Sequence, residues 1–419
     1  MTPAQVGRRR AVEALRSGVP SWDAVMALGS GQGDIEDAYG RLLSAAEGGS
    51  AGGLLFGAGF GEGKSHLLTH LAQVALERGF VVSTVVISKE TPLHDPAKVL
   101  RAAVESLIGP HRVSGALTET AAALDPDTPR YAELMRWLHS PHAPDERFAA
   151  TLLLHERLRG GEVPDSEQVV ETVLRFWAGD TLRMPELRRA LKSVGAAGQY
   201  TFGPIPAKEL ARQRLRFLSR LLQAAGHAGW VLLFDEVELI GRYSVLQRGR
   251  SYAELARLVG GDPDDATAPL AAVLAVTDDF EAAVLTGKDD RTLVPARLRA
   301  KQTPEYDELA TWAARGIRHL DRDVMLLEAP DEAELDRAYR VLKELHGAAY
   351  DWTPPDVPGL ERLGATRMRQ YVRAWINAWD LVRLDPDHEP DTEVVELATS
   401  YEQDDDLDRD DDLGGAVSH

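Results

Sequence analysis

A glycine-rich segment that ends in Gly-Lys-Ser, at residues 57–65, limits the possible folds of this chain more than any other part of its sequence. It reads GAGFGEGKS, follows the short apolar run 53–57, and precedes an amphipathic helical stretch at 65–78. Small residues allow successive backbone N–H groups to converge on phosphate oxygens, and the positive end of the next helix adds to the attraction. A flexible glycine turn is the alternative, but the strand-to-helix context favours a phosphate-binding loop.

The residues of this loop have separate expected roles. Lys64 would reach the β- and γ-phosphates of ATP, and the Ser65 hydroxyl would coordinate Mg²⁺. Ala58 stands where the pattern has glycine, which is a tolerated departure. We interpret His66 as a packing residue that faces the core or the sheet edge. The expected nucleotide-binding residues are Ala58, Gly59, Phe60, Gly61, Glu62, Gly63, Lys64, Ser65 and His66.

A second motif follows the apolar run 231–234, where Asp235 and Glu236 end a predicted central strand. Ligands of open α/β sheets bind at the carboxyl ends of the strands. Asp235 would hold the magnesium ion through water, and Glu236 would polarise the water that attacks ATP. An Asp-Glu pair after four apolar residues is common by itself, so its weight comes from the loop at 57–65. The two motifs together are typical of AAA+ and related ATP-hydrolysing proteins.

Two further positions fit the nucleotide sensors of AAA+ proteins. A buried strand at 271–276 ends in polar residues, of which Thr277 is the first choice for sensor 1 and Asp278 the second. An ordinary turn after the strand is the alternative. In the C-terminal helical region Arg367 follows a glycine by three residues, as in the sensor 2 pattern, with Arg369 as the alternate. A solvated helix arginine is the competing interpretation.

Other charged residues have weaker support. Arg315 and Arg318 qualify as arginine fingers only by their position before a predicted strand at Val324. Lys89 and Glu90 end the predicted strand 80–87 and could respond to the nucleotide, although an exposed ion pair is the preferred interpretation.

The order strand, loop, helix, strand begins a parallel sheet. We therefore predict an α/β fold of the AAA+-type P-loop NTPase class, with a parallel sheet, a long helical insertion and a C-terminal helical lid. The expected parts are an N-terminal helical segment at 1–52, a nucleotide-binding core at 53–110 and 227–330, an insertion at 111–226, a lid at 331–385 and an acidic, disordered tail at 386–419.

Composition excludes several classes of protein. The chain has no cysteine, which removes disulfides, thiolate metal sites and cysteine nucleophiles. No apolar run approaches the roughly 18 residues of a membrane span, and no apolar stretch follows the basic N-terminus as in a secretory signal. We expect a cytoplasmic protein that does not act at a membrane.

The formal net charge of −19 is unevenly distributed. Residues 402–412 hold eight acids and one arginine, so solubility or partner binding is the expected role of this tail. Nine basic and two acidic residues lie between 183 and 220. Within that window Arg212, Arg216 and Arg220 recur at four-residue spacing and share one helical face, which could contact double-stranded DNA. Pairing with acids elsewhere in the chain is the alternative.

Four stretches together resemble a known family. They are 8–15, 59–68, 86–93 and 277–280, and they are similar to the P-loop ATP-binding proteins of bacteriophage-exclusion (BREX) and phage-growth-limitation loci, of the BrxD type. Such proteins resemble the origin-recognition branch of AAA+ ATPases. The resemblance implies an Mg²⁺-dependent ATPase that works with other phage-defence proteins and with DNA, and that could form homo-oligomers. Initiator ATPases carry a winged-helix domain after the lid, but only a short acidic stretch follows Leu381, so a DNA-binding module is expected in the insertion.

Two other functions remain open on the sequence. The first is a nucleotide-gated signalling or scaffold protein that assembles partners without touching DNA, which the acidic charge favours. The complete set of Lys64, Asp235 and Glu236 favours hydrolysis instead. The second is a small-molecule kinase, which is disfavoured because the sequence shows no acceptor-binding motif.

Overall fold

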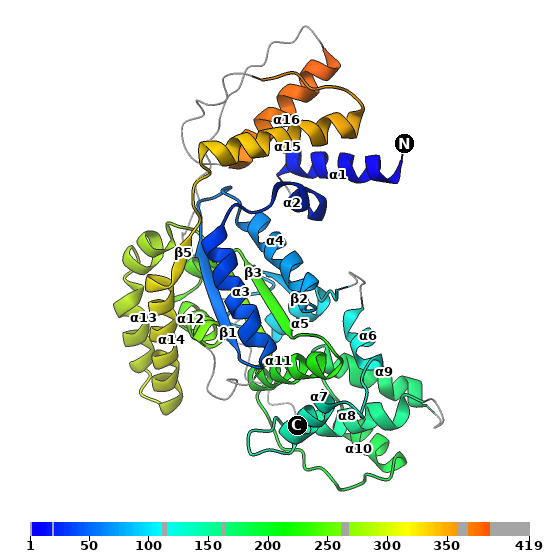
Figure 1. The fold of residues 1–419 in the computed structure, drawn as a ribbon. Coiled ribbons are helices and arrows are strands. Elements are labelled where there is room, and N and C mark those ends of the chain that lie inside the picture. Colours follow the sequence, from blue (N-terminus) through cyan, green and yellow to red (C-terminus); the bar gives the residue numbers. More distant parts are fainter. Residues whose placement is uncertain are drawn as a thin grey trace.

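A computed structural model describes residues 2–18, 21–110, 115–160, 165–260, 268–357 and 368–385. Helices surround a central sheet, with one helical unit above the carboxyl ends of the strands and another below the sheet (Figure 1). The predicted Arg367 and the acidic tail lie outside the described residues.

The sheet has five strands, all parallel, in the order β2-β3-β4-β1-β5. This confirms the predicted α/β class with a parallel sheet. β4 lies between the strand that leads into the glycine-rich loop and the strand that ends in Asp235. The strands are β1 (Gly52–Gly57), β2 (Val81–Val86), β3 (Trp230–Asp235), β4 (Leu270–Val276) and β5 (Val324–Leu326).

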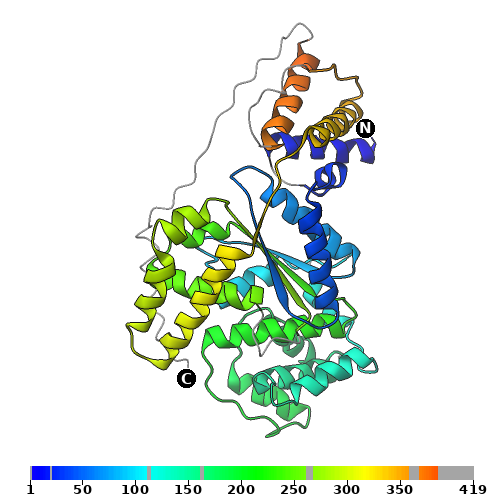
Figure 2. The same ribbon diagram turned by 60° about the vertical axis from the view of Figure 1, so that its left-hand side comes forward.

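Helices cover both faces of the sheet, which explains why its strands are almost continuously apolar. One face packs on α3 (Gly33–Glu47) and α4 (Lys64–Glu77). The other packs on α5 (Pro96–Glu105), α11 (Ala207–Ala224) and α12 (Val245–Gly260). In Figure 2 the blue helix α3 lies on one side of the sheet and the yellow-green helices lie on the other.

Helices from both ends of the chain form the upper unit (Figure 1). They are α1 (Pro3–Ser17), α2 (Trp22–Leu28), α15 (Glu332–Tyr350) and α16 (Met368–Leu384), and we call these four helices the lid. Within residues 1–52, α1 and α2 pack in the lid, whereas α3 packs on the sheet. Polar contacts add to the apolar core of the lid: Arg9 Nε donates to the Ala349 carbonyl at 2.9 Å, and Arg16 pairs with Asp380 at 2.5 Å.

The described residues of the insertion form helices and loops, and none of them lies in a strand. Its core is aromatic, with Phe148, Phe176, Trp177 and Phe217 fully buried. α11 carries Phe217 and also packs on α5 and β3, so this long helix attaches the insertion to the core. The insertion helices before it are α6 (Ala116–Ala122), α7 (Pro129–Leu138), α8 (Glu146–Leu158), α9 (Ser166–Trp177) and α10 (Met184–Ser193).

A buried ion pair joins two helices beside the sheet. Arg248 on α12 donates to both carboxylate oxygens of Asp290, at 2.8 and 2.7 Å, and Tyr252 donates to the same carboxylate at 2.5 Å. Both charged residues are almost completely buried. Asp290 begins α13 (Asp290–Arg299), which is followed by α14 (Pro304–Arg322); the short helices η1 (Val237–Arg242) and η3 (Glu281–Thr286) follow β3 and β4.

We predict that Asp290→Ala lowers the free energy of unfolding by about 3–5 kcal/mol, because it leaves the Arg248 guanidinium buried without its carboxylate. Asp321→Ala is the matched control: it removes the 2.5 Å pair of Asp321 with the partly exposed Arg291, and should cost less than about 1 kcal/mol. Urea denaturation measures both. Similar losses in the two variants would contradict the importance of the buried pair.

Candidate nucleotide site

The glycine-rich loop lies between β1 and α4, as predicted. Gly61 has a φ of 83° and Gly63 a φ of 107°. Side chains rarely tolerate this left-handed region, so these two glycines are required by the backbone. Gly63 is also the N-cap of α4. The loop therefore directs the N-terminal end of a 14-residue helix towards its own concave side.

The predicted metal ligands come together at the carboxyl ends of β1 and β3. The Ser65 hydroxyl donates to Asp235 Oδ2 at 2.7 Å, although the two residues are 170 positions apart. Oxygen donors of this kind suit Mg²⁺. The pair forms without distortion because β1 and β3 both run parallel to β4 and end at the same edge of the sheet.

Glu236 directly follows this pair in an unusual conformation. Its φ is 60°, one of the few positive values outside glycine among the described residues. Its N–H donates to Asp235 Oδ1 at 2.9 Å. Burial, followed by the nearby Asp235 charge, raises the pKa of its carboxyl group. Backbone strain at such a position is typical of functional sites.

The end of β4 is bonded directly to the glycine-rich loop. Ala58 N–H donates to the Val276 carbonyl at 3.2 Å, and Asp278 N–H donates to the Ala58 carbonyl at 3.3 Å. Thr277 is buried between these contacts, with an exposed fraction of 3%, whereas Asp278 is exposed. Both sensor 1 candidates thus lie beside the loop, Thr277 buried and Asp278 exposed.

Lys64 has a neighbour that the sequence analysis missed. The Lys64 ammonium donates to the Ala58 carbonyl at 3.2 Å and lies 3.6 Å from Glu238 Oε1. Glu238 is 2% exposed. The signal in the sequence was the second acid of Asp-Glu-Val-Glu, which a short helix turns back towards the loop.

The loop also contains an acid that binds its own backbone. Glu62 Oε2 accepts a hydrogen bond from Gly59 N–H at 2.6 Å. A carboxylate thus satisfies one of the loop donors inside the loop itself. The predicted binding residue Phe60 is 38% exposed.

A cavity of about 130 Å³ separates the lid from the loop. Its walls are mainly apolar and come from α1, α2, α4, α15, α16 and the segment after β5. Its wall residues include Leu15, Leu28, His66, Leu67, Leu327 and Val372. His66 Nε2 hydrogen-bonds to the Gly29 carbonyl at 2.7 Å, and burial lowers its pKa. His66 therefore packs, as expected, but it also lines the cavity.

Arg369, the alternate lid arginine, lies between the lid and the loop. It donates to the Gly18 carbonyl at 2.6 Å. Its Cδ and Nη1 atoms lie 3.8 and 4.0 Å from the point that a Cβ on Gly61 would occupy. Since Arg367 is outside the described residues, Arg369 is the lid arginine that the structure brings to the phosphate loop.

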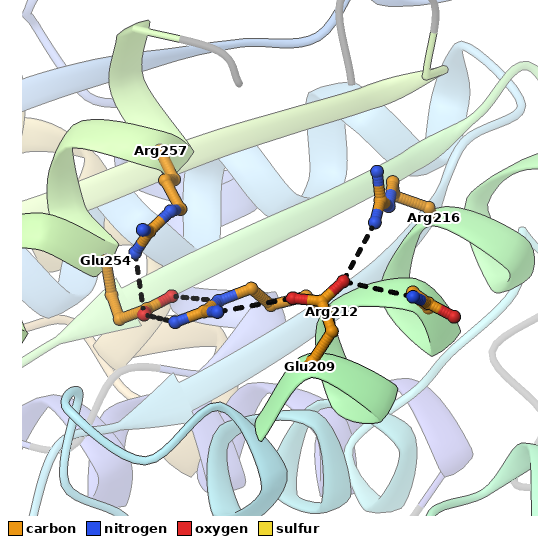
Figure 3. Close-up of polar contacts among 6 residues, drawn as sticks. Glu209, Arg212, Arg216, Glu254 and Arg257 are labelled. Atoms are coloured by element: carbon orange, nitrogen blue, oxygen red, sulfur yellow. Dashed lines mark hydrogen bonds and ion pairs between the residues drawn. The ribbon is translucent and has the colours of Figure 1, made fainter. Parts of the chain in front are cut away.

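The arginines of α11 are engaged within the chain (Figure 3). Arg212 pairs with Glu254 and, at 3.4 Å, with Glu209; Arg216 reaches the same Glu209 at 3.4 Å. Arg220 is 8% exposed and stacks on the Trp137 ring at 4.0 Å. The pair of Arg212 with Glu254 of α12 is a contact of the kind that the pairing interpretation expected, whereas Glu209 lies on α11 itself and Trp137 is not an acid.

The remaining predicted residues lie on the surface. Arg315 and Arg318 are exposed on α14, where Arg315 stacks on the Trp312 ring at 4.7 Å. The arginine-finger assignment stays a prediction, because such a residue would act on a second protomer. Lys89 and Glu90 are exposed beyond β2.

With this geometry, comparison with known proteins is informative. The family model for the BREX system ATP-binding protein BrxC/D matches residues 5–121 and 205–349, more than half of the chain. The chain belongs to this family. The matched residues include the glycine-rich loop, Asp235, Glu236 and Thr277, whereas 122–204 of the insertion fall outside them. Neither the curated proteins nor the solved structures that were compared give a match.

Membership identifies an ATP-binding component of a BREX system, which has a role against phage and includes other proteins as partners. It confirms the resemblance to BREX ATP-binding proteins. None of the described helices is long and apolar enough to span a membrane.

We predict that Arg369→Ala weakens ATP binding about tenfold, because a charge-assisted contact contributes roughly 1.5–3 kcal/mol. Arg373→Ala, on the exposed side of the same helix, should change the affinity little. Equilibrium binding of a fluorescent ATP analogue measures both. If Arg369→Ala binds normally and Arg367→Ala does not, the lid arginine is Arg367.

Proposed function

We propose that this chain is an AAA+-type, Mg²⁺-dependent ATPase of a BREX system. The observation that carries the proposal is the 2.7 Å hydrogen bond between Ser65 and Asp235, with Glu236 next in the chain. A site that only binds nucleotide needs the loop but not a strained acid beside the metal ligands. The position of β4 between β1 and β3 also supports the AAA+ type, because it brings a sensor 1 candidate beside the loop.

Each of these residues would have its own role in ATP hydrolysis. Lys64 and the N–H groups of the loop bind the β- and γ-phosphates and oppose their charge. Ser65 and Asp235 would hold Mg²⁺, which supplies further positive charge to the phosphates. Water attacks the γ-phosphorus, the bond to the ADP oxygen breaks, and Glu236 accepts the proton of the water. A raised pKa makes the Glu236 carboxylate a better base near neutral pH. Thr277 orients the water, and Arg369 acts from the lid.

Assembly and location are part of the same proposal. The chain works in the cytoplasm with other proteins of its defence locus. In a homo-oligomer, Arg315 or Arg318 of one protomer would reach the nucleotide of the next. Their exposure on α14 leaves both side chains accessible to a second copy.

We further propose that the insertion contacts double-stranded DNA through α10 in place of α11. The three α11 arginines are engaged by Glu209, Glu254 and Trp137. The cations of α10 differ: their side chains are exposed and pair with none of the described residues. They are Arg188, Arg189 and Lys192. Free cations on one helix can exchange their counterions for DNA phosphates without breaking an internal ion pair.

We predict that Glu236→Gln retains ATP and loses at least about 100-fold of the turnover, because the amide cannot accept the proton. Lys64→Ala should instead lose tight ATP binding. Glu133→Gln, which changes an exposed carboxylate on α7, is the control. Phosphate release and nucleotide binding measure the three variants. Turnover at the wild-type rate in Glu236→Gln would favour the nucleotide-gated scaffold.

We predict that replacing Arg188, Arg189 and Lys192 with glutamine makes the affinity for duplex DNA less dependent on salt. The slope of log affinity against log salt should fall by about three, one for each lost phosphate contact. The matched variant, with glutamine at Arg212, Arg216 and Arg220, should keep that dependence and lose stability. Fluorescence anisotropy across a salt series and thermal unfolding measure both. If the α11 variant loses the salt dependence and the α10 variant keeps it, the DNA contact lies on α11. If the wild type does not bind the duplex, the insertion does not contact DNA.

A further inference from the structure

Glu238 is a buried acid that the proposed hydrolysis does not use. It lies on η1, three residues after Asp235, and is 2% exposed. Its Oε1 atom lies 3.6 Å from the Lys64 ammonium. Its Oε2 atom is buried and has no hydrogen-bond partner among the described residues. One oxygen of this carboxylate therefore lies near a cation, and the other has no hydrogen-bond partner among the described residues.

The charges around Glu238 are mostly of its own sign. It faces Lys64 from α4, and Asp235 and Glu236 from the end of β3. The other cations near η1 act on other groups: Arg248 of α12 binds Asp290, and Lys288 donates to the Gly241 carbonyl at 2.9 Å. Arg242, at the end of η1, favours the ionised form of Glu236. Lys64 is thus the cation that stabilises the ionised form of Glu238.

Burial raises the pKa of Glu238 to about 7, while the Lys64 charge acts in the opposite direction. Removing the influence of Lys64 would therefore raise this pKa further. Near pH 8 the carboxylate is mostly ionised only while the lysine is beside it.

ATP requires the same ammonium group. Lys64 can oppose the charge of the β- and γ-phosphates only if it turns towards them, and the phosphates bring further negative charge to the place that Glu238 faces. A buried carboxylate that loses its cation has two alternatives: to remain charged at a high cost, or to accept a proton.

We propose that Glu238 is a positioning residue that holds the Lys64 ammonium before nucleotide binds. Glu238 then takes up one proton from water when the Lys64 side chain turns to the phosphates of ATP. This inference rests on the proposed function only in that ATP binds at this loop. The carboxylate keeps the ammonium in place inside a buried site. Its protonation then removes the attraction that would compete with the nucleotide.

The direction of the pH effect follows from this exchange. A ligand that binds with uptake of a proton loses affinity as pH rises. Above pH 7 the empty protein carries an ionised Glu238 and the complex a protonated one. The affinity for ATP should then fall by up to about tenfold per pH unit, whereas a protein with glutamine at this position lacks this contribution.

Calorimetric titration of the full chain with Mg²⁺ and a non-hydrolysable ATP analogue at pH 8 tests the exchange. Two buffers of different ionisation enthalpy give the number of protons taken up. We expect about one more proton in the wild type than in Glu238→Gln. The ratio of their affinities should fall by up to about tenfold between pH 7.5 and 8.5. Glu156→Gln is the matched control, because burial also raises the pKa of this carboxyl group, on the distant helix α8.

Each outcome decides between the two proposals. Equal proton uptake in the wild type and in a folded Glu238→Gln protein overturns the role of Glu238. A wild type that binds no analogue overturns ATP binding at this loop, and with it the inference. If Glu238→Gln does not fold, Glu238→Asp is the second variant, because it keeps a titrating carboxylate and should retain the pH dependence of ATP binding. Binding of the analogue to the wild type without proton uptake would also exclude the proposed protonation of Glu238.

Discussion

The parallel pairing of β4 with both β1 and β3 is the constraint on which the candidate site depends. It fixes the carboxyl ends of three strands at one edge of the sheet, so that Ser65 and Asp235 are hydrogen-bonded and Thr277 lies beside the same loop, although long stretches of chain separate them. Because apolar side chains bury both faces of these strands, the register cannot slip without exposing part of the core. The precision of the site is therefore a property of the sheet and not of its loops.

The sequence was sufficient for the features that local chemistry determines. The phosphate loop needs small residues and positive φ angles, and the strands of a parallel sheet need continuous apolar runs, so both can be recognised in the chain. The pairing of Arg212 with Glu254 could not be predicted, because it depends on how α11 packs on α12. Glu238 was missed for a similar reason: its chemistry comes from burial beside Lys64, which a short helix creates in three dimensions.

The lid joins helices that are far apart in the sequence. Arg9 and Ala349 are 340 positions apart, yet they are hydrogen-bonded. No periodicity within either segment indicates this contact, since each helix only shows that it has an apolar face. The lid in turn lines part of the cavity: Leu15 contributes apolar surface and Arg369 contributes a positive charge. Helices far apart in the sequence thus line the cavity of the candidate nucleotide site together with the loop.

This arrangement has a consequence for how the protein is made. The apolar face of α1, with Ala11, Val12 and Leu15, is synthesised long before its partners on α15 and α16. Until then the face stays exposed to water or to other chains, which is a source of aggregation in large proteins. The sheet can form earlier from its own strands. The cavity beside the glycine-rich loop is therefore completed only after α15 and α16 have been made, and a nascent chain that already has this loop still lacks the part of the wall that these helices supply.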